Sequence, residues 1–135
     1  MIAVSGSGIA GLAAALAVLR NQKPLLLVAG RTPATTLQGG VQIAPNGWAA
    51  LDQLGLGDAA RARATTLQAI TVRDMRSAAT LASLDLSASP YASLSRADLA
   101  SLLRAEISAL SGMTDIAANI THVVQRGADQ GKAGH

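Results

Sequence analysis

The chain has 135 residues, half of them hydrophobic, which corresponds to one domain or part of one. It contains no cysteine, which excludes disulfides and thiolate metal sites, and its two histidines, His122 and His135, lack the spacing of zinc ligands. The formal net charge of +3 comes from singly scattered basic residues, and one Trp, one Tyr and no Phe leave few surfaces for base stacking. We therefore expect no nucleic-acid partner and no metal, and a cytoplasmic location is compatible with the absence of cysteine.

The N-terminus carries the most informative pattern. The apolar run of residues 2–5 leads into G-x-G-x-x-G, and an alanine-rich helical pattern continues from Gly8 to Arg20. This order is the strand–turn–helix context of a dinucleotide site. Gly6 would allow the tight turn, Gly8 would let a pyrophosphate approach the backbone, and Gly11 would let the helix pack close to the strand. The alternatives are a structural glycine turn and a membrane span, but three glycines interrupt the apolar segment and no basic residue precedes it, so we expect no span.

A second buried strand is predicted at residues 25–28, with Asn21 closing the first helix in the left-handed conformation. In a dinucleotide fold this second strand should end in Asp or Glu, about 20 residues after the glycines, to bind the ribose. Gly30 occupies that position, so the carboxylate is missing. Arg31 follows, and it could contact a phosphate or an adenine, or be an ordinary solvated arginine.

The remaining elements follow from turn, capping and periodicity signals. Residues 32–40 read as a polar loop, Asn46 as the cap of a helix over 47–54, and Gly55 as its end. Alternating residues at 69–75 and 81–86 predict a β-hairpin that turns at 76–80. A helix should start at Ser95, with Asp98 three residues on as in a capping box, and a last strand is expected at 116–124. We expect residues 1–125 to form the folded part and residues 126–135 a disordered tail.

These pieces resemble a known family. The N-terminal glycine motif, the segment Gly40–Asn46 with the leucines behind it, and Ser95-Arg96-Ala97-Asp98-Leu99 occur in the order and spacing of the FAD-dependent aromatic-ring hydroxylases. These are the class A flavoprotein monooxygenases with the para-hydroxybenzoate hydroxylase fold. The resemblance implies an α/β fold: a Rossmann-like FAD-binding domain with a partial parallel sheet and a β-hairpin.

The resemblance also implies roles for particular residues. The FAD pyrophosphate would lie against Gly6, Ser7, Gly8, Ile9, Ala10 and Gly11. Gly30 and Arg31 fall where the family has Glu followed by Arg or a polar residue. Val41 and Gln42 would lie in a loop beside the flavin, and Arg96 would reach back to the FAD, where a guanidinium suits a pyrophosphate. No residue is identified as catalytic.

The sequence differs from the family in length and in the motifs that it contains. Two later family motifs are not found: an Asp-Gly pair that contacts FAD and NAD(P)H, and a Gly-Asp pair that binds the ribityl chain. The chain therefore looks like the N-terminal third of such an enzyme, a truncated product or a fragment. We expect the FAD-binding part of a monooxygenase that uses NAD(P)H and O₂ on a small aromatic substrate, inactive alone unless another chain supplies the missing part. The alternative is a non-catalytic dinucleotide-binding module or remnant.

Overall fold

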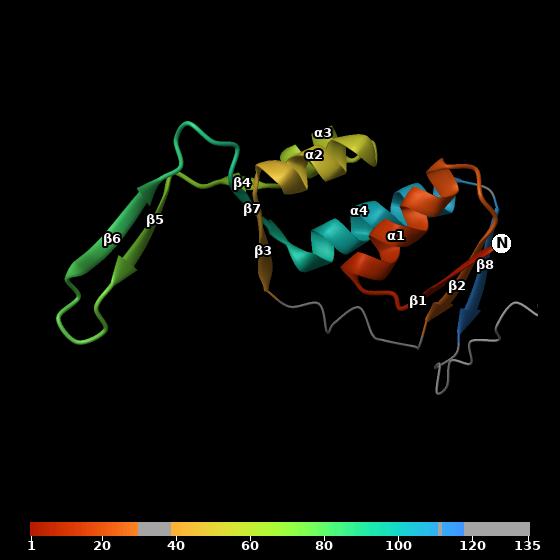
Figure 1. The fold of residues 1–135 in the computed structure, drawn as a ribbon, viewed down its shortest axis with the longest axis horizontal. Helices are drawn as coiled ribbons and strands as arrows, with labels where there is room; N and C mark the ends of the chain where they lie inside the picture. The colour runs from red at the N-terminus through yellow and green to blue at the C-terminus, as the bar shows by residue number, and fades with distance from the viewer. Residues whose placement is uncertain (30–38, 111, 118–135) are drawn as a thin grey trace, which may run out of the picture.

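A computed structural model describes residues 1–29, 39–110 and 112–117 (Figure 1). Over these residues the chain forms a parallel sheet, a separate antiparallel sheet, a β-hairpin and four helices. The elements in chain order are β1 (Ile2–Ser5), α1 (Ile9–Arg20), β2 (Leu25–Ala29), β3 (Gly40–Ile43), α2 (Pro45–Gln53), α3 (Gly57–Arg61), β4 (Thr65–Thr66), β5 (Ala69–Arg73), β6 (Thr80–Asp85), β7 (Ala92–Ser95), α4 (Arg96–Ala109) and β8 (Met113–Ala117). The predicted α/β class with a partial parallel sheet and a hairpin is confirmed.

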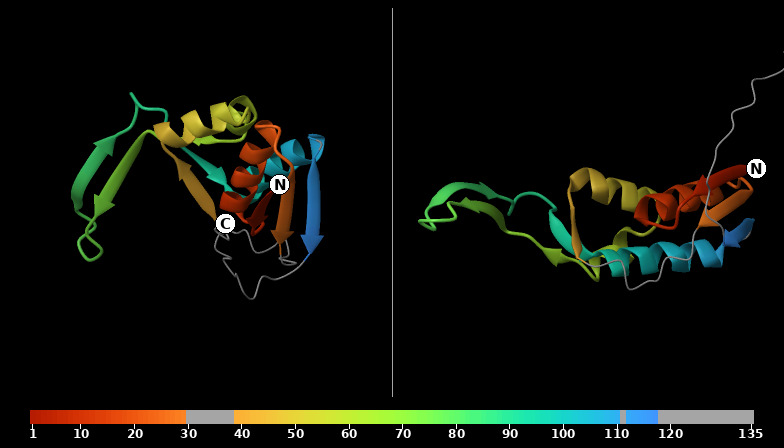
Figure 2. Two further views of the ribbon diagram at one scale, coloured as in Figure 1. Left: turned by 45° about the vertical axis from the view of Figure 1, so that its right-hand side comes forward. Right: turned by 90° about the horizontal axis from the view of Figure 1, so that it is seen from below.

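The parallel sheet has the strand order β1-β2-β8. The connection from β1 to β2 and the connection from β2 to β8 both move to the next strand in the same direction across the sheet. Because crossovers between parallel strands are right-handed, both connections place their helices on the same face of the sheet. Accordingly α1 and α4 lie side by side next to this sheet (Figures 1 and 2). The buried residues Leu25 and Leu27 of β2 belong to the core that these two helices share.

The two helices meet through apolar stripes at helical spacing. The buried residues of α1 are Leu12, Ala15, Leu16 and Leu19, and those of α4 are Leu99, Ala100, Leu102, Leu103 and Ile107. An ion pair joins the helices, with Nη2 of Arg20 2.9 Å from Oε2 of Glu106. The core between the two helices is therefore built mainly from Leu and Ala.

The observed helix ends confirm some of the predicted caps and contradict others. Ser95 caps α4 as predicted: its Oγ accepts a hydrogen bond from the Asp98 N–H at 3.0 Å. The prediction for Asn21 is wrong, because its φ is −85° and the left-handed residue is Gln22, with φ 55°. Asn21 instead donates from Nδ2 to the Ala17 carbonyl at 2.8 Å, and its backbone N–H donates to the same carbonyl at 3.2 Å.

The segment after residue 38 is more ordered than a loop. Residues 40–43 form β3, which pairs antiparallel with β7, so the predicted loop placement of Val41 and Gln42 is wrong. Asn46 is not a cap either, since α2 starts at Pro45 with Ala44 before it. Proline suits the first helical position because the missing N–H has no partner there. Gly55 follows the end of α2 as predicted, with φ +68°.

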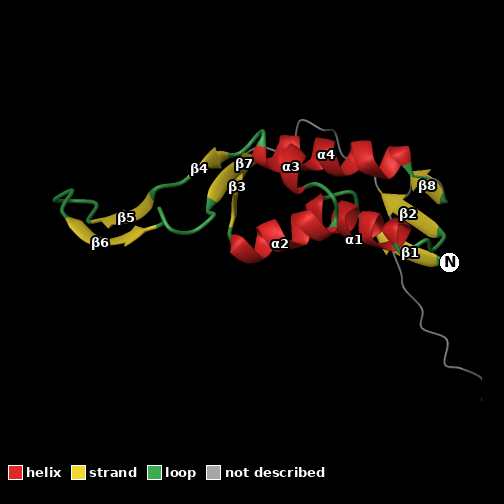
Figure 3. Cartoon of the chain, turned by 90° about the horizontal axis from the view of Figure 1, so that it is seen from above, coloured by secondary structure: helices red, strands yellow, loops and turns green. Residues whose placement is uncertain are grey.

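The predicted hairpin is confirmed and stands away from the helices (Figures 1 and 3). Asp74 holds its turn by accepting hydrogen bonds at Oδ1 from the N–H groups of Arg76 and Ser77, at 3.0 and 2.7 Å. The last strand starts earlier than predicted, at Met113, and the predicted residues beyond Ala117 lie outside the described part, as does the predicted tail.

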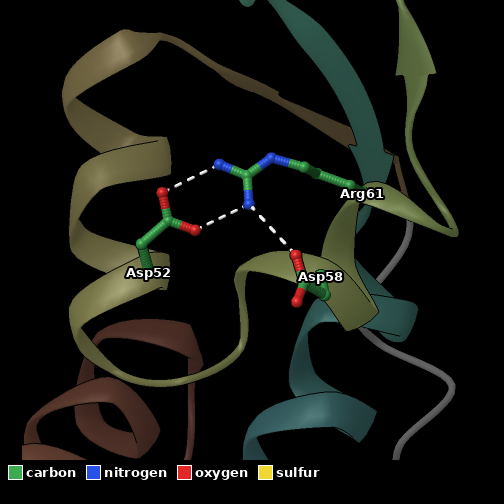
Figure 4. Close-up of polar contacts among 3 residues, drawn as sticks. All are labelled: Asp52, Asp58 and Arg61. Carbon is green, nitrogen blue, oxygen red and sulfur yellow. Dashed lines mark hydrogen bonds and ion pairs between the residues drawn. The ribbon is translucent and has the colours of Figure 1, made fainter.

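A charged cluster on α2 and α3 fixes the position of these short helices (Figure 4). Arg61 binds both carboxylate oxygens of Asp52, with distances of 2.6 and 2.8 Å, and its Nη1 is 3.7 Å from Oδ1 of Asp58. Its guanidinium carbon also lies 4.9 Å from the centre of the buried Trp48 ring. The hydrogen bonds from Arg61 hold the pKa of the Asp52 carboxyl below its ordinary value.

This lowered pKa predicts a pH effect on stability. The Asp52 contribution is fully present above its ordinary pKa, about 4, and is lost as the pH falls through the lower pKa of the folded state. Thermal unfolding of Asp52→Asn between pH 7 and 3 should therefore show a smaller loss of stability on acidification than the unchanged chain. Asp58→Asn, which removes a fully exposed carboxylate on the same arginine, is the matched control and should follow the unchanged chain. Parallel curves for all three proteins would contradict this role of Asp52.

Candidate functional site

The glycine motif lies at the carboxyl edge of the parallel sheet, between β1 and α1. The Gly6 N–H donates to the Val28 carbonyl at 2.8 Å, which attaches the turn to the end of the neighbouring strand β2. Since parallel strands end at the same edge, β2 and β8 also terminate at this side of the molecule. This is the edge at which open α/β sheets bind ligands.

Each of the three glycines has the local geometry that the motif requires. Gly6 has φ +105°, a conformation that side chains rarely adopt. A Cβ on Gly11 would lie 2.1 Å from the Gly6 carbonyl oxygen, so any side chain would push α1 off the turn. A Cβ on Gly8 would meet nothing within 4 Å. The turn is thus tightly closed at Gly6 and Gly11 and open at Gly8.

The open side of the turn, at Gly8, lies at the start of α1. Gly8 is the N-cap and supplies no side-chain cap, and the first turn contains no acidic residue. The N–H groups at a helix start have no partner within the helix, and the helix dipole makes this end partly positive. The arrangement suits an anion that approaches Gly8, Ile9 and Ala10, of which Gly8 and Ala10 are exposed and Ile9 is half-buried.

One arginine side chain reaches this region from α4. The guanidinium of Arg104 donates from Nη2 to the Ser7 carbonyl at 3.2 Å, directly within the glycine motif. Arg96, the predicted FAD contact, begins the same helix and is exposed, and its N–H donates to the Gly39 carbonyl at 3.0 Å. Within the described residues the Arg96 side chain forms no ion pair or hydrogen bond. Sequence reasoning missed Arg104, because nothing in a helical pattern indicates contact with a turn 97 residues away.

The other predicted site residues are only partly placed. Half-buried Val41 and exposed Gln42 lie on β3. This strand pairs with β7, the strand that directly precedes α4. Gly30 and Arg31 lie outside the described residues, as do both histidines. Among the described residues, no group of three or more His, Asp or Glu side chains is arranged to hold a metal ion. No helix in this part of the chain is both long and apolar enough to cross a bilayer.

Comparison with curated proteins finds similar sequences among aromatic hydroxylases, although no family model matches the chain. The 3-amino-4-hydroxybenzoate 2-monooxygenase PtnB3 of Streptomyces platensis is 40% identical over 105 residues, which are 73% of this chain and 26% of the relative. The 3-hydroxybenzoate 6-hydroxylase 1 of Aquipseudomonas alcaligenes is 30% identical over 125 residues, 87% of this chain and 32% of the relative. The chain thus spans about a quarter to a third of the length of these relatives.

Solved structures show the same fold. The p-nitrophenol 4-monooxygenase PnpA from Pseudomonas putida DLL-E4 superposes with a TM-score of 0.72 at 22% identity, over 84% of this chain and 30% of that one. HpxO of Klebsiella pneumoniae, solved with FAD and uric acid, superposes over the same shares with a TM-score of 0.67 at 23% identity. In sequence and fold, the chain therefore belongs with the FAD-dependent aromatic-ring hydroxylases, the class A flavoprotein monooxygenases, and corresponds to their N-terminal portion.

Proposed function

We propose that this chain is the FAD-binding part of a flavin-dependent monooxygenase that hydroxylates a small aromatic substrate with NAD(P)H and O₂. The observation that carries the proposal is the glycine turn, closed by the contact of Gly11 with Gly6 and open at Gly8, in front of an uncapped helix start. The hydroxybenzoate hydroxylases among the relatives, which resemble this chain over most of its length, support the substrate class.

The residues present fit an FAD pyrophosphate. The turn from Gly6 to Gly11 would hold it through backbone N–H groups, and Arg96 would contribute a positive charge from the start of α4. Gly30 and Arg31 would lie near the ribose, and Val41 and Gln42 beside the flavin. Bound FAD would supply the redox chemistry, while the residues of this chain bind it and orient it.

The proposed activity also requires a part that this chain does not include. Within the described residues β1 pairs on one edge only, with β2, and the sheet leaves Ile2 and Ile116 each 43% exposed. The hairpin exposes Val72 and Leu84, at 52% and 58%. These exposed apolar surfaces support the proposal that a partner polypeptide packs here and completes the flavin and substrate sites. The proposed location is the cytoplasm, where NAD(P)H is available. By itself the chain should bind cofactor without turnover.

Binding of FAD tests the proposal directly. The purified chain should quench FAD fluorescence with a dissociation constant in the micromolar range. Gly8→Val should abolish the quenching, because the branched side chain would occupy the open side of the turn, and Arg96→Ala should weaken it by about tenfold through the lost charged contact. A folded chain that does not bind FAD would contradict the proposal and favour a remnant without a working site.

The glycine geometry predicts that two matched substitutions affect different properties: one lowers stability and the other weakens FAD binding. Gly11→Ala should lower the free energy of unfolding by about 1–3 kcal/mol or prevent folding, because its methyl group would overlap the Gly6 carbonyl. Gly8→Ala should lower stability by less than about 1 kcal/mol, because alanine is a poorer helix cap than glycine although its methyl group enters open space at an extended backbone position. It should nevertheless weaken FAD binding. Urea unfolding measures the first effect and fluorescence titration the second. A Gly11→Ala variant as stable as the unchanged chain would mean that the turn is not closed at Gly11.

A further inference from the structure

The hydrogen bond from Arg104 to Ser7 joins α4 to the glycine motif. Nη2 of Arg104 lies 3.2 Å from the Ser7 carbonyl oxygen, and the two residues are 97 positions apart in the chain. The arginine follows Leu103, which is 1% exposed, and precedes Ile107, which is 3% exposed, and both belong to the core shared with α1. The packing of α4 on α1 therefore holds the base of the Arg104 side chain next to the turn.

The bond acts on a peptide group that a ligand would use. The Ser7–Gly8 peptide is trans, as are all peptide bonds described, so its C=O and N–H point in opposite directions across a rigid plane. When Arg104 holds the Ser7 oxygen on the α4 side, the Gly8 N–H must point to the opposite side. Were this peptide to rotate, a carbonyl oxygen would replace the N–H, and an oxygen repels an anion.

We propose that Arg104 is a positioning residue that fixes the Ser7–Gly8 peptide so that the Gly8 N–H faces the phosphate site. The ligand side of this inference rests on the proposed FAD function, whereas the orientation of the peptide does not depend on it. A charged donor suits the role, because hydrogen bonds from guanidinium to a carbonyl are stronger than neutral ones. Two glycines flank Ser7, and because glycine restricts backbone rotation least, the Arg104 contact adds to the constraint that the bond from Gly6 to Val28 places on this turn.

This role differs from that of Arg96. The two arginines lie on one helix, and a rise of about 1.5 Å per residue separates their Cα atoms by roughly 12 Å along the axis. Arg104 binds a backbone atom of the turn, whereas the Arg96 side chain is free of protein partners within the described residues. Arg104 therefore organises the turn before a ligand arrives, and Arg96 is left to contact a ligand directly.

The test compares Arg104→Gln and Arg104→Lys with the control Arg73→Gln, which removes one exposed positive charge from the hairpin. In the free chain, the carbonyl carbon resonance of Ser7 and the amide resonance of Gly8 should shift in Arg104→Gln and stay unchanged in the control. Affinity for ADP should fall about tenfold in Arg104→Gln, while affinity for adenosine, which has no phosphate, should not change. Arg104→Lys keeps a charged donor and should recover part of both effects.

The outcomes separate the inference from the proposed function. If ADP affinity falls while the Ser7 and Gly8 resonances do not move, Arg104 contacts phosphate directly and the positioning role is overturned. Unchanged resonances together with unchanged ADP affinity overturn it as well. If the unchanged chain binds neither ADP nor FAD but the Ser7 and Gly8 resonances shift in Arg104→Gln, the FAD function fails and the positioning of the peptide by Arg104 is supported.

Discussion

The close approach of α1 to the turn before it is the constraint on which the rest of the structure depends. At Gly11 the helix backbone lies so near the Gly6 carbonyl that no Cβ fits between them. This contact determines where α1 begins and how it leaves the sheet, and hence that Leu12 and Leu16 face the core. It also leaves the first N–H groups of the helix facing outward at the carboxyl edge of the sheet. The packing of α1 and the exposure of its N–H groups therefore have one common cause.

Helix α4 supports this arrangement from the side. Its apolar stripe packs against α1, and polar contacts join the two helices at separate levels: Glu106 with Arg20 near the end of α1, and Arg104 with Ser7 just before its start. Exposed ion pairs and hydrogen bonds of this kind contribute little stability. Their effect is on orientation, because they limit sliding and rotation of one helix against the other. The same helix carries Arg96 at its first residue, so one rigid element positions both arginines.

The hairpin formed by β5 and β6 has a different balance of forces. An isolated two-stranded ribbon is at best marginally stable in water, and the register places Ile70, Val72, Ala82 and Leu84 on one face. Bonds to Asp74 hold its turn, but most of that apolar face remains exposed. Such a surface is typical of an element that packs against further protein. The chain spans 26% and 32% of the two hydroxybenzoate relatives.

The sequence by itself determined the elements whose causes are local. The strand–glycine–helix order at the N-terminus, the Ser95 cap and the hairpin each depend on neighbouring residues, as does the left-handed Gly55, so patterns of composition and spacing were enough to predict them. The loop placement of Val41 and Gln42 was wrong because β3 exists only through pairing with β7, about fifty residues later. The cap prediction at Asn46 was wrong because the helix starts at Pro45, two residues before the predicted start at residue 47, which places Asn46 inside the helix. Only the tertiary structure brought Arg104 to Ser7, since that contact depends on how two helices pack and no local pattern encodes it.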